Sequence, residues 1–276
     1  MGLRSVFYYI IFFIFINNSI YSESFYVNNQ YVHKICVNSK YFVVRGHNAE
    51  VCREVSEIAN NYLVNIVSNF LPQYAEFPHK ILIKIFQDHK SYVDAGNPEW
   101  SGGIYDHTPI LALGPGRNII SFYEGMLERQ LKDTLPHEIT HCVLNEYFGG
   151  RRIPLWLNEG LAQSVESFAS QNKKRKTMND FIKKGKHLSL NKLFVVKNYP
   201  KKKEEISLFY CKSHSITRYL IEHLDKDNFK RFLSLVKDGL PMDVILKALT
   251  NDKNASVKKL QEAWLKSIIN EERKTR

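Results

Sequence analysis

Two histidines four residues apart are the side chains of this 276-residue chain best placed to do chemistry. They belong to the run His137-Glu138-Ile139-Thr140-His141. Residues four apart share one face of an α-helix, so both imidazoles can bind a single Zn²⁺ ion. Glu138 is then beside the metal, in position for a general base. A catalytic zinc site uses three protein ligands and keeps a further position open, so one more ligand is needed.

The missing ligand is predicted at Glu159, within the sequence WLNEGLA of residues 156–162. Gly149 and Gly150 predict the end of the first helix, and Pro154 marks the beginning of a second one. Two antiparallel helices joined in this way bring Glu159 back over the two histidines. The sequence therefore predicts a His-His-Glu zinc site on a helical hairpin.

Three neighbours of Glu159 are predicted to support this site. Glu166 follows Glu159 by seven residues, which places both on one helix face, and Asn158 is adjacent to Glu159 in the sequence. Either side chain could fix the tautomer of an imidazole ligand. Gly160 is expected to let the two helices approach closely.

The sequence LPHEITHCVLNEYFGGRRIPLWLNEGLA of residues 135–162 resembles the gluzincin metallopeptidases and, among them, the secreted peptidase MA-like group. GGIYD (102–106) with ILALG (110–114) is similar to the sheet edge that precedes the zinc helix in such proteins. FYCKSHSITRYLIEHL (209–224) is similar to the helix that follows the zinc site. The similarity covers about residues 42–264. It implies a thermolysin-like or gluzincin-like α+β catalytic domain with one Zn²⁺ ion and a peptide or protein substrate.

The same resemblance implies a role for each residue. The two histidines and Glu159 hold the zinc ion, and Glu138 takes a proton from a zinc-activated water that attacks the peptide bond. A later helix supplies a donor to the oxyanion in families of this type, and the resemblance aligns Tyr210 with that position. His214, four residues further on, is the second candidate. The alternative for Tyr210 is an aromatic residue of the apolar core.

One motif of the aminopeptidase branch of this clan is missing. Those enzymes carry Gly-x-Met-Glu-Asn on a strand, and its Glu binds the free amine of the substrate. The corresponding stretch here, residues 102–106, reads GGIYD and contains no Glu. Endopeptidase action on peptides or proteins is therefore favoured over exopeptidase action.

Two other functions remain open from the sequence. A zinc-retaining but catalytically idle surface protein could bind a partner through the same fold, although Glu138 would then have no task. A basic adhesin attached to an anionic cell-wall polymer would need no zinc. Metal content separates the adhesin from the other two, and peptide cleavage separates the enzyme from the idle protein.

The net charge of +11 at pH 7 is carried largely by three lysine-rich runs. These runs contain few aromatic residues and lie between apolar-periodic segments, so solvated loops or helix faces are favoured over attraction to an anionic substrate or polymer. No nucleic-acid-binding motif is present, and the sequence indicates no oligomeric state. The runs are residues 173–176, 183–186 and 201–203.

The first 24 residues are predicted to be a signal peptide. Residues 6–16 form an apolar run behind the basic Arg4. This run is shorter than the about 20 residues of a membrane-spanning helix but suits the apolar region of a leader. Cleavage near Ser22 or Ser24 would give a secreted protein. An uncleaved N-terminal anchor is the alternative, and only then is a membrane a partner.

Four cysteines in an exported chain invite pairing. Cys36 and Cys52 are close enough in sequence for a local disulfide. Cys142 and Cys211 are expected to be small buried apolar residues. None of the four has the spacing of a zinc ligand.

The hydrophobic pattern predicts an α+β fold. Asn48 is expected to cap a long helix that ends before Pro72. Pro136 must start or kink the zinc helix, because proline lacks a backbone donor. Strands are expected at residues 41–45, 80–87, 110–113 and 118–121, and later helices at 155–169, 205–224, 227–236, 242–249 and 256–269.

These elements predict one metallopeptidase domain over residues 25–276. A small N-terminal α/β layer is expected over residues 25–122, and a mainly helical part over residues 123–276. The cleft should lie between the two parts, with the zinc helix as its floor.

Overall fold

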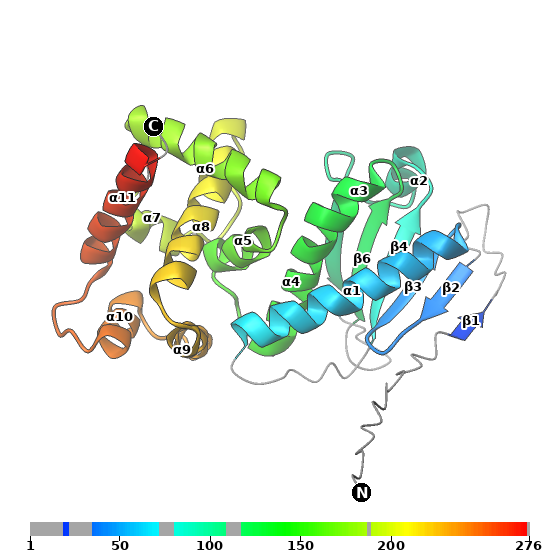
Figure 1. Cartoon of the computed structure of the whole chain (residues 1–276), viewed down its shortest axis with the longest axis horizontal. Helices are drawn as coiled ribbons and strands as arrows, with labels where there is room; N and C mark the ends of the chain where they lie inside the picture. The colour runs from blue at the N-terminus through cyan, green and yellow to red at the C-terminus, as the bar shows by residue number, and fades with distance from the viewer. Residues whose placement is uncertain (1–18, 22–34, 72–79, 109–116, 187–188, 275–276) are drawn as a thin grey trace, which may run out of the picture.

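The computed structural model describes residues 19–21, 35–71, 80–108, 117–186 and 189–274 (Figure 1). Most of the predicted leader and the strand predicted at 110–113 lie outside these ranges. Among the helices within them, none has the length and apolar character needed to cross a membrane.

The N-terminal part of the described chain is built on a mixed six-stranded sheet. Its central strands β3, β4 and β6 are parallel, whereas β2 and β5 pair antiparallel with β3 and β6. The strands predicted at 41–45, 80–87 and 118–121 are confirmed. The order is β1-β2-β3-β4-β6-β5, with β1 at Ser19–Tyr21, β2 at Ile35–Asn38, β3 at Phe42–Gly46, β4 at Ile81–Phe86, β5 at Gly103–Thr108 and β6 at Arg117–Tyr123.

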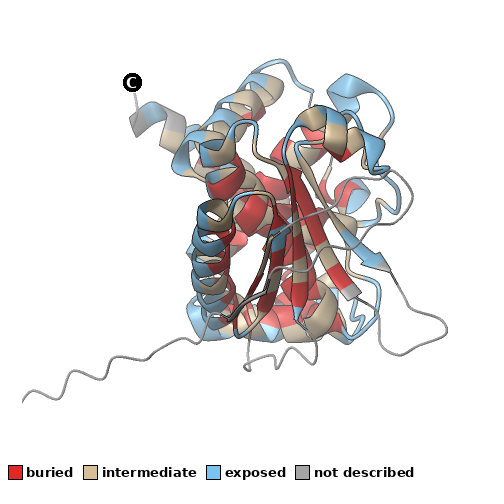
Figure 2. Cartoon of the chain, turned by 90° about the vertical axis from the view of Figure 1, so that its right-hand side faces the viewer, coloured by how far each residue is buried: buried red, intermediate tan, exposed pale blue. Residues whose placement is uncertain are grey.

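Two helices cover one face of this sheet. α1 (Ala49–Phe70) packs on β2 and β3, α4 (Leu135–Phe148) packs on β5 and β6, and the helices contact each other. Val44, Ile83 and Ile120 lie opposite one another on three neighbouring strands, and all three are fully buried. Figure 2 shows the buried residues along the central strands. This layer fixes α4, which carries the two histidines, against the sheet.

α1 begins where the sequence predicted. The side-chain oxygen of Asn48 accepts hydrogen bonds from the backbone N–H groups of Glu50 and Val51. An asparagine in this position satisfies two of the donors that every helix leaves unpaired at its first turn. The predicted helix and its cap are confirmed.

Every described element after β6 is helical, which confirms the predicted α+β class. The central helix of this half is α8 (Lys203–His223), which packs on α5, α6 and α9. In Figure 1 these helices lie beside the sheet layer rather than on its open face. The remaining elements are α2 (His89–Asp94), α3 (Leu127–Arg129), the π-helix η1 (Gln130–Thr134), α5 (Leu155–Ser164), α6 (Phe168–Lys183), α7 (Leu190–Phe194), α9 (Lys226–Lys237), α10 (Met242–Thr250) and α11 (Val257–Lys274).

The single helix predicted over residues 155–169 is wrong, because the chain forms two helices there. α5 ends at Ser164, and the side chain of Ser167 caps α6 by accepting the Ser170 N–H. Gln171 Nε2 donates to the carbonyl oxygens of Ser164 and Glu166. A serine cap overrides the apolar periodicity, and Glu166 therefore lies in a turn rather than on the face of α5.

Gly160 lets α5 approach α8, not the zinc helix. A Cβ atom on Gly160 would lie 2.0 Å from Thr217 Oγ1 and 2.6 Å from the Ser213 carbonyl oxygen. Both distances are well inside van der Waals contact, so only glycine fits. The close approach fixes α5, and with it Glu159, against the central helix of the helical half.

Pro136 lies in the first turn of α4, directly after the π-helix η1. The Leu135 N–H donates to the Gln130 carbonyl, five residues back, so the helix is widened just before the proline. This wider turn relieves the clash between a proline ring and the carbonyl four residues earlier. The helical path therefore continues into the His137 turn. At the other end, Gly149 closes α4 with a φ of 59°, as predicted.

All four cysteines are free thiols in the structure. The local disulfide considered for Cys36 and Cys52 is not formed. Cys142 and Cys211 are buried, as expected for small apolar residues.

Lys212 on α8 is fully buried, and its Nζ has no hydrogen-bond partner among the described residues. The ammonium lies 5.4 Å from the centre of the Trp264 ring. Burial lowers the pKa of Lys212 from 10.5 to about 7. At a pH between these two pKa values, Lys212 is charged in the unfolded chain and neutral in the folded one. Unfolding therefore takes up a proton there, and stability rises with pH.

We expect Lys212→Met to stabilise the protein by roughly 1–4 kcal/mol at pH 7, because folding no longer has to remove the proton of a buried lysine. The advantage over the wild type should shrink as the pH rises toward 10.5. Denaturant unfolding at several pH values between about 6.5 and 10 measures both effects. Lys226→Met, at an exposed site, is the control. A gain that is independent of pH would contradict the prediction.

Candidate metal centre

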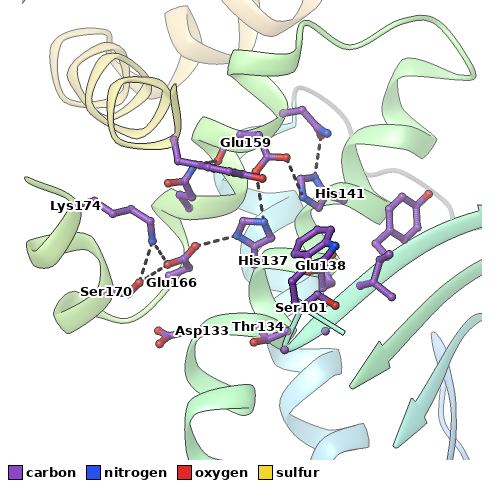
Figure 3. A pocket seen from close by; sticks show the side chains of 18 of the residues that line it. Ser101, Asp133, Thr134, His137, Glu138, His141, Glu159, Glu166, Ser170 and Lys174 are labelled. Carbon is purple, nitrogen blue, oxygen red and sulfur yellow. Dashed lines mark hydrogen bonds and ion pairs between the residues drawn. The ribbon is translucent and has the colours of Figure 1, made fainter. Parts of the chain in front are cut away.

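Two helices bring the three predicted metal ligands together. His137 and His141 come from α4 and Glu159 from α5, and one ligand atom from each lies within 4.8 Å of the others. His137 Nε2 lies 3.6 Å from Glu159 Oε2, and His141 Nε2 lies 3.9 Å from Glu159 Oε1. The two nitrogens and the carboxylate thus face one point, as Figure 3 shows.

The other ring nitrogens of the two histidines are bonded to neighbouring oxygens. His137 Nδ1 lies 2.9 Å from Glu166 Oε1, and His141 Nδ1 lies 3.0 Å from Asn158 Oδ1. Oxygens of this kind accept a hydrogen bond from Nδ1–H, so the Nε2 lone pair of each neutral ring is directed at Glu159. The structure therefore places both predicted supporting residues at the imidazoles.

The site has the chemistry of a cation site. Glu159 is only 3 % exposed, and its Oε2 has no hydrogen-bond partner among the described residues. A buried carboxylate oxygen without a partner is costly unless a cation neutralises it. Two imidazole Nε2 atoms, which must be unprotonated to bind a metal, and one carboxylate match the ligand set of a catalytic zinc site. The three residues therefore fit a zinc ion.

Glu166 is the most strongly held carboxylate of the site. Besides His137 it accepts hydrogen bonds from Ser170 Oγ at 2.5 Å and from Lys174 Nζ. Burial alone would raise the pKa of Glu166, but His137 and Lys174 lower it to about 2. Burial alone would likewise lower the pKa of His137, but the bond to Glu166 and three nearby carboxylates raise it to about 9. Glu166 thus stays an anion and orients His137.

The metal centre opens into a cleft of about 990 Å³. One wall is the edge strand β5 with the loop before it, and the opposite wall comes from α5, the beginning of α6 and α8. Glu138 is 8 % exposed and faces this cleft beside the two histidines. The predicted cleft between the sheet and the helical half, with the zinc helix at its base, is confirmed.

The two candidates for the oxyanion donor lie in different surroundings. Tyr210 lines the cleft, whereas His214 is fully buried and does not line it. His214 Nε2 lies 3.5 Å from Gln171 Oε1, on the side of α8 that packs under α6. His214 lies one helical turn after Tyr210 and is covered by the neighbouring helices. Its position therefore does not fit a hydrogen-bond donor to the substrate oxyanion.

Tyr199 is a site residue that the sequence did not reveal. It lies in the loop between α7 and α8, lines the cleft, and its hydroxyl donates a hydrogen bond to Glu159 Oε1. Its ring is stacked on that of Tyr210, with centres 6.1 Å apart. Partial burial and the Glu159 carboxylate raise the pKa of Tyr199, which keeps the phenol protonated. No periodic spacing marks a loop residue 40 positions from its partner, so only the fold could find it.

Tyr199→Phe is expected to weaken zinc binding by about 10- to 100-fold, because residues that hold a metal ligand in place contribute that much to metal affinity. Competition with a chromophoric chelator measures the dissociation constant directly. Tyr210→Phe is the matched control, since its hydroxyl has no hydrogen bond to Glu159 among the described contacts. Equal zinc affinities for wild type and Tyr199→Phe would remove Tyr199 from the metal centre.

An α+β domain with a buried His-His-Glu centre, formed by His-Glu-x-x-His on one helix and Glu on the next, defines a metallopeptidase of the gluzincin type. The model of the Peptidase MA superfamily matches residues 75–270, and the chain belongs to this family. Its substrates are therefore peptides or proteins. Among curated proteins, no sequence matches this chain.

Proposed function

We propose that the protein is an exported, zinc-dependent endopeptidase. The observation that carries the proposal is the unpartnered Oε2 of Glu159, which is buried beside the Nε2 atoms of His137 and His141. A zinc-retaining protein that only bound a partner would have no task for Glu138, which faces the cleft beside the two histidines.

Each residue has a defined task in the proposed reaction. Zinc, when bound, lowers the pKa of a water to about 7 and polarises the scissile carbonyl. Glu138 takes the proton of the attacking water and passes it to the nitrogen of the leaving amine. The Tyr210 hydroxyl donates a hydrogen bond to the carbonyl oxygen as negative charge develops there. Glu166 and Asn158 keep the histidine rings in the required orientation.

Internal cleavage is favoured by what lines the cleft. Gly102, Gly103, Ile104 and Tyr105 of the sheet edge face it, and none of them offers a carboxylate to a free amine. Export is proposed from the apolar run at residues 6–16, with membrane anchoring as the alternative if this run is retained. Comparing the N-terminal residue of the mature chain with Met1 tests export.

Metal analysis combined with cleavage profiling tests the proposal. We expect about one Zn²⁺ per purified chain, and loss of the metal in His137→Ala and Glu159→Ala but not in His223→Ala, a control at an exposed histidine. The zinc-loaded protein should cut an unbiased peptide library at internal bonds, and a chelator should stop it. Zinc without cleavage would favour the idle binding protein, and a chain that binds no zinc would favour the adhesin.

A further inference from the structure

The excess of positive over negative charge lies in one segment of the sequence. The chain has 39 Lys and Arg against 28 Asp and Glu, whereas residues 168–203 hold 12 basic residues and only Asp180 as an acid. The rest of the chain therefore holds 27 of each and is neutral. A general preference for lysine would spread the excess along the sequence. Here the entire excess of +11 lies between the beginning of α6 and the beginning of α8.

This segment borders the cleft at both of its ends. Ser170 and Lys174 of α6 line the cleft, and so do Tyr199 and Pro200 from the loop before α8. Pro200 directly precedes the run of lysines 201–203, and Ile206, which follows that run, also lines the cleft. Figure 1 shows α6 and the beginning of α8 side by side at the top of the helical half. Lys174 thus lines the helical wall of the cleft and lysines 201–203 adjoin it, and these four cations are called the basic rim.

Several of these cations have no acid to neutralise them. Lys186 pairs with Glu204 and Lys202 with Glu205, and the cleft-lining Lys174 pairs with Glu166. Elsewhere, exposed lysines such as Lys90 and Lys132 pair with acids of their own helix. Seven exposed lysines of the segment have no ion pair in the described part of the chain: Lys173, Lys176, Lys184, Lys192, Lys197, Lys201 and Lys203.

We propose that this basic rim selects acidic polypeptides as substrates, an inference that rests on the proposed peptidase function. Cations without an acidic partner attract a negatively charged polypeptide over several ångströms and raise its local concentration near the metal centre. The rim continues into a wall that holds the candidate catalytic residue Tyr210, so a chain bound there passes the metal ligands. The three lysine runs contain no aromatic residue, so they offer no stacking surface to the bases of a single-stranded nucleic acid.

Peptides that share one neutral central sequence and are flanked by glutamates, glutamines or lysines test the proposal. At low salt we expect kcat/KM to be roughly tenfold higher for the glutamate-flanked than for the glutamine-flanked peptide, and the ratio to fall toward one at high salt. Lys201→Glu/Lys203→Glu should abolish the preference. Acidic residues suit the first turn of a helix, so the double variant is compatible with α8.

Lys226→Glu/Arg231→Glu on α9 is the matched control, since it changes the net charge equally at exposed sites that do not line the cleft. It should keep the preference. Equal losses in both variants, or no preference in the wild type, would overturn the proposal. So would Lys201-dependent binding of phosphatidylserine vesicles or duplex DNA without any preference among the peptides.

Binding is measured separately with fluorescent peptides and the zinc-loaded Glu138→Gln protein. If this protein prefers the glutamate-flanked peptide while the wild type cuts none of them, the hydrolytic function fails and the recognition of acidic polypeptides stands. If the wild type cuts all three peptides equally and the binding constants are also equal, the peptidase function stands and the basic rim has no role in selection.

Discussion

Glu138→Gln is expected to keep zinc and the fold and to lower kcat by about 10²- to 10⁴-fold. Glutamine has the shape of glutamate but cannot accept the proton of the attacking water. Glu138 is not among the three residues that converge on the metal point, so its replacement leaves the ligand set whole. The loss should therefore appear in kcat, whereas zinc content and thermal unfolding remain those of the wild type.

Glu128→Gln is the matched control for this variant. Glu128 lies in α3, just before the zinc helix, where it accepts a hydrogen bond from Lys132 at the surface and does not line the cleft. The same change of atoms there should alter the rate less than about twofold, because Glu128 does not line the cleft. It should also leave the fold intact, since exposed ion pairs contribute little to stability. Wild-type rates in zinc-loaded Glu138→Gln would show that another residue moves the proton.

The metal centre could be predicted from sequence because its information is local. A spacing of four residues on a helix puts His137 and His141 on one face, and two glycines followed by a proline mark the turn that returns Glu159. Each of these steps uses a property of consecutive residues. The same holds for α1, whose cap and apolar stripe lie within one segment.

Contacts between distant segments could not be predicted in the same way. Tyr199 reaches Glu159 from a loop, and Lys174 belongs to a charged run that periodicity describes as a solvated face. The turn that carries Glu166 depends on the cap at Ser167, and the burial of His214 depends on the packing of α6 over α8. In each case the tertiary arrangement, not the local pattern, sets the environment of the side chain.

The position of Glu166 depends on both the local sequence pattern and the tertiary arrangement. The sequence placed it on the face of Glu159 for a geometric reason that the structure does not bear out, since α5 ends at Ser164. It nevertheless reaches His137, because the turn folds back toward α4 and the Ser167 N–H is held by Asp133 Oδ1. The beginning of α6 then adds Ser170 and Lys174 to the same carboxylate.

Tyr210→Phe tests the remaining catalytic assignment, and we expect kcat to fall by about 10²- to 10³-fold with little change in KM. Removing the hydroxyl deletes one hydrogen bond that forms only as the carbonyl oxygen becomes negative. The stacking of the ring on Tyr199 is retained, so the fold should survive. Burial, followed by the Glu159 and Glu138 carboxylates, raises the pKa of Tyr210, which keeps the hydroxyl protonated and able to donate.

The comparison with His214 decides between the two donors that the sequence offered. His214→Asn changes a fully buried side chain whose neighbour is Gln171, so we expect it to lower stability while kcat per folded molecule stays near the wild-type value. Steady-state kinetics on samples corrected for zinc content separates the two effects. A normal kcat in Tyr210→Phe beside a crippled His214→Asn would transfer the donor role to His214. A normal kcat in both variants would show that neither side chain stabilises the charge on the carbonyl oxygen. Tyr199, whose ring is stacked on that of Tyr210, would then be the next residue to replace.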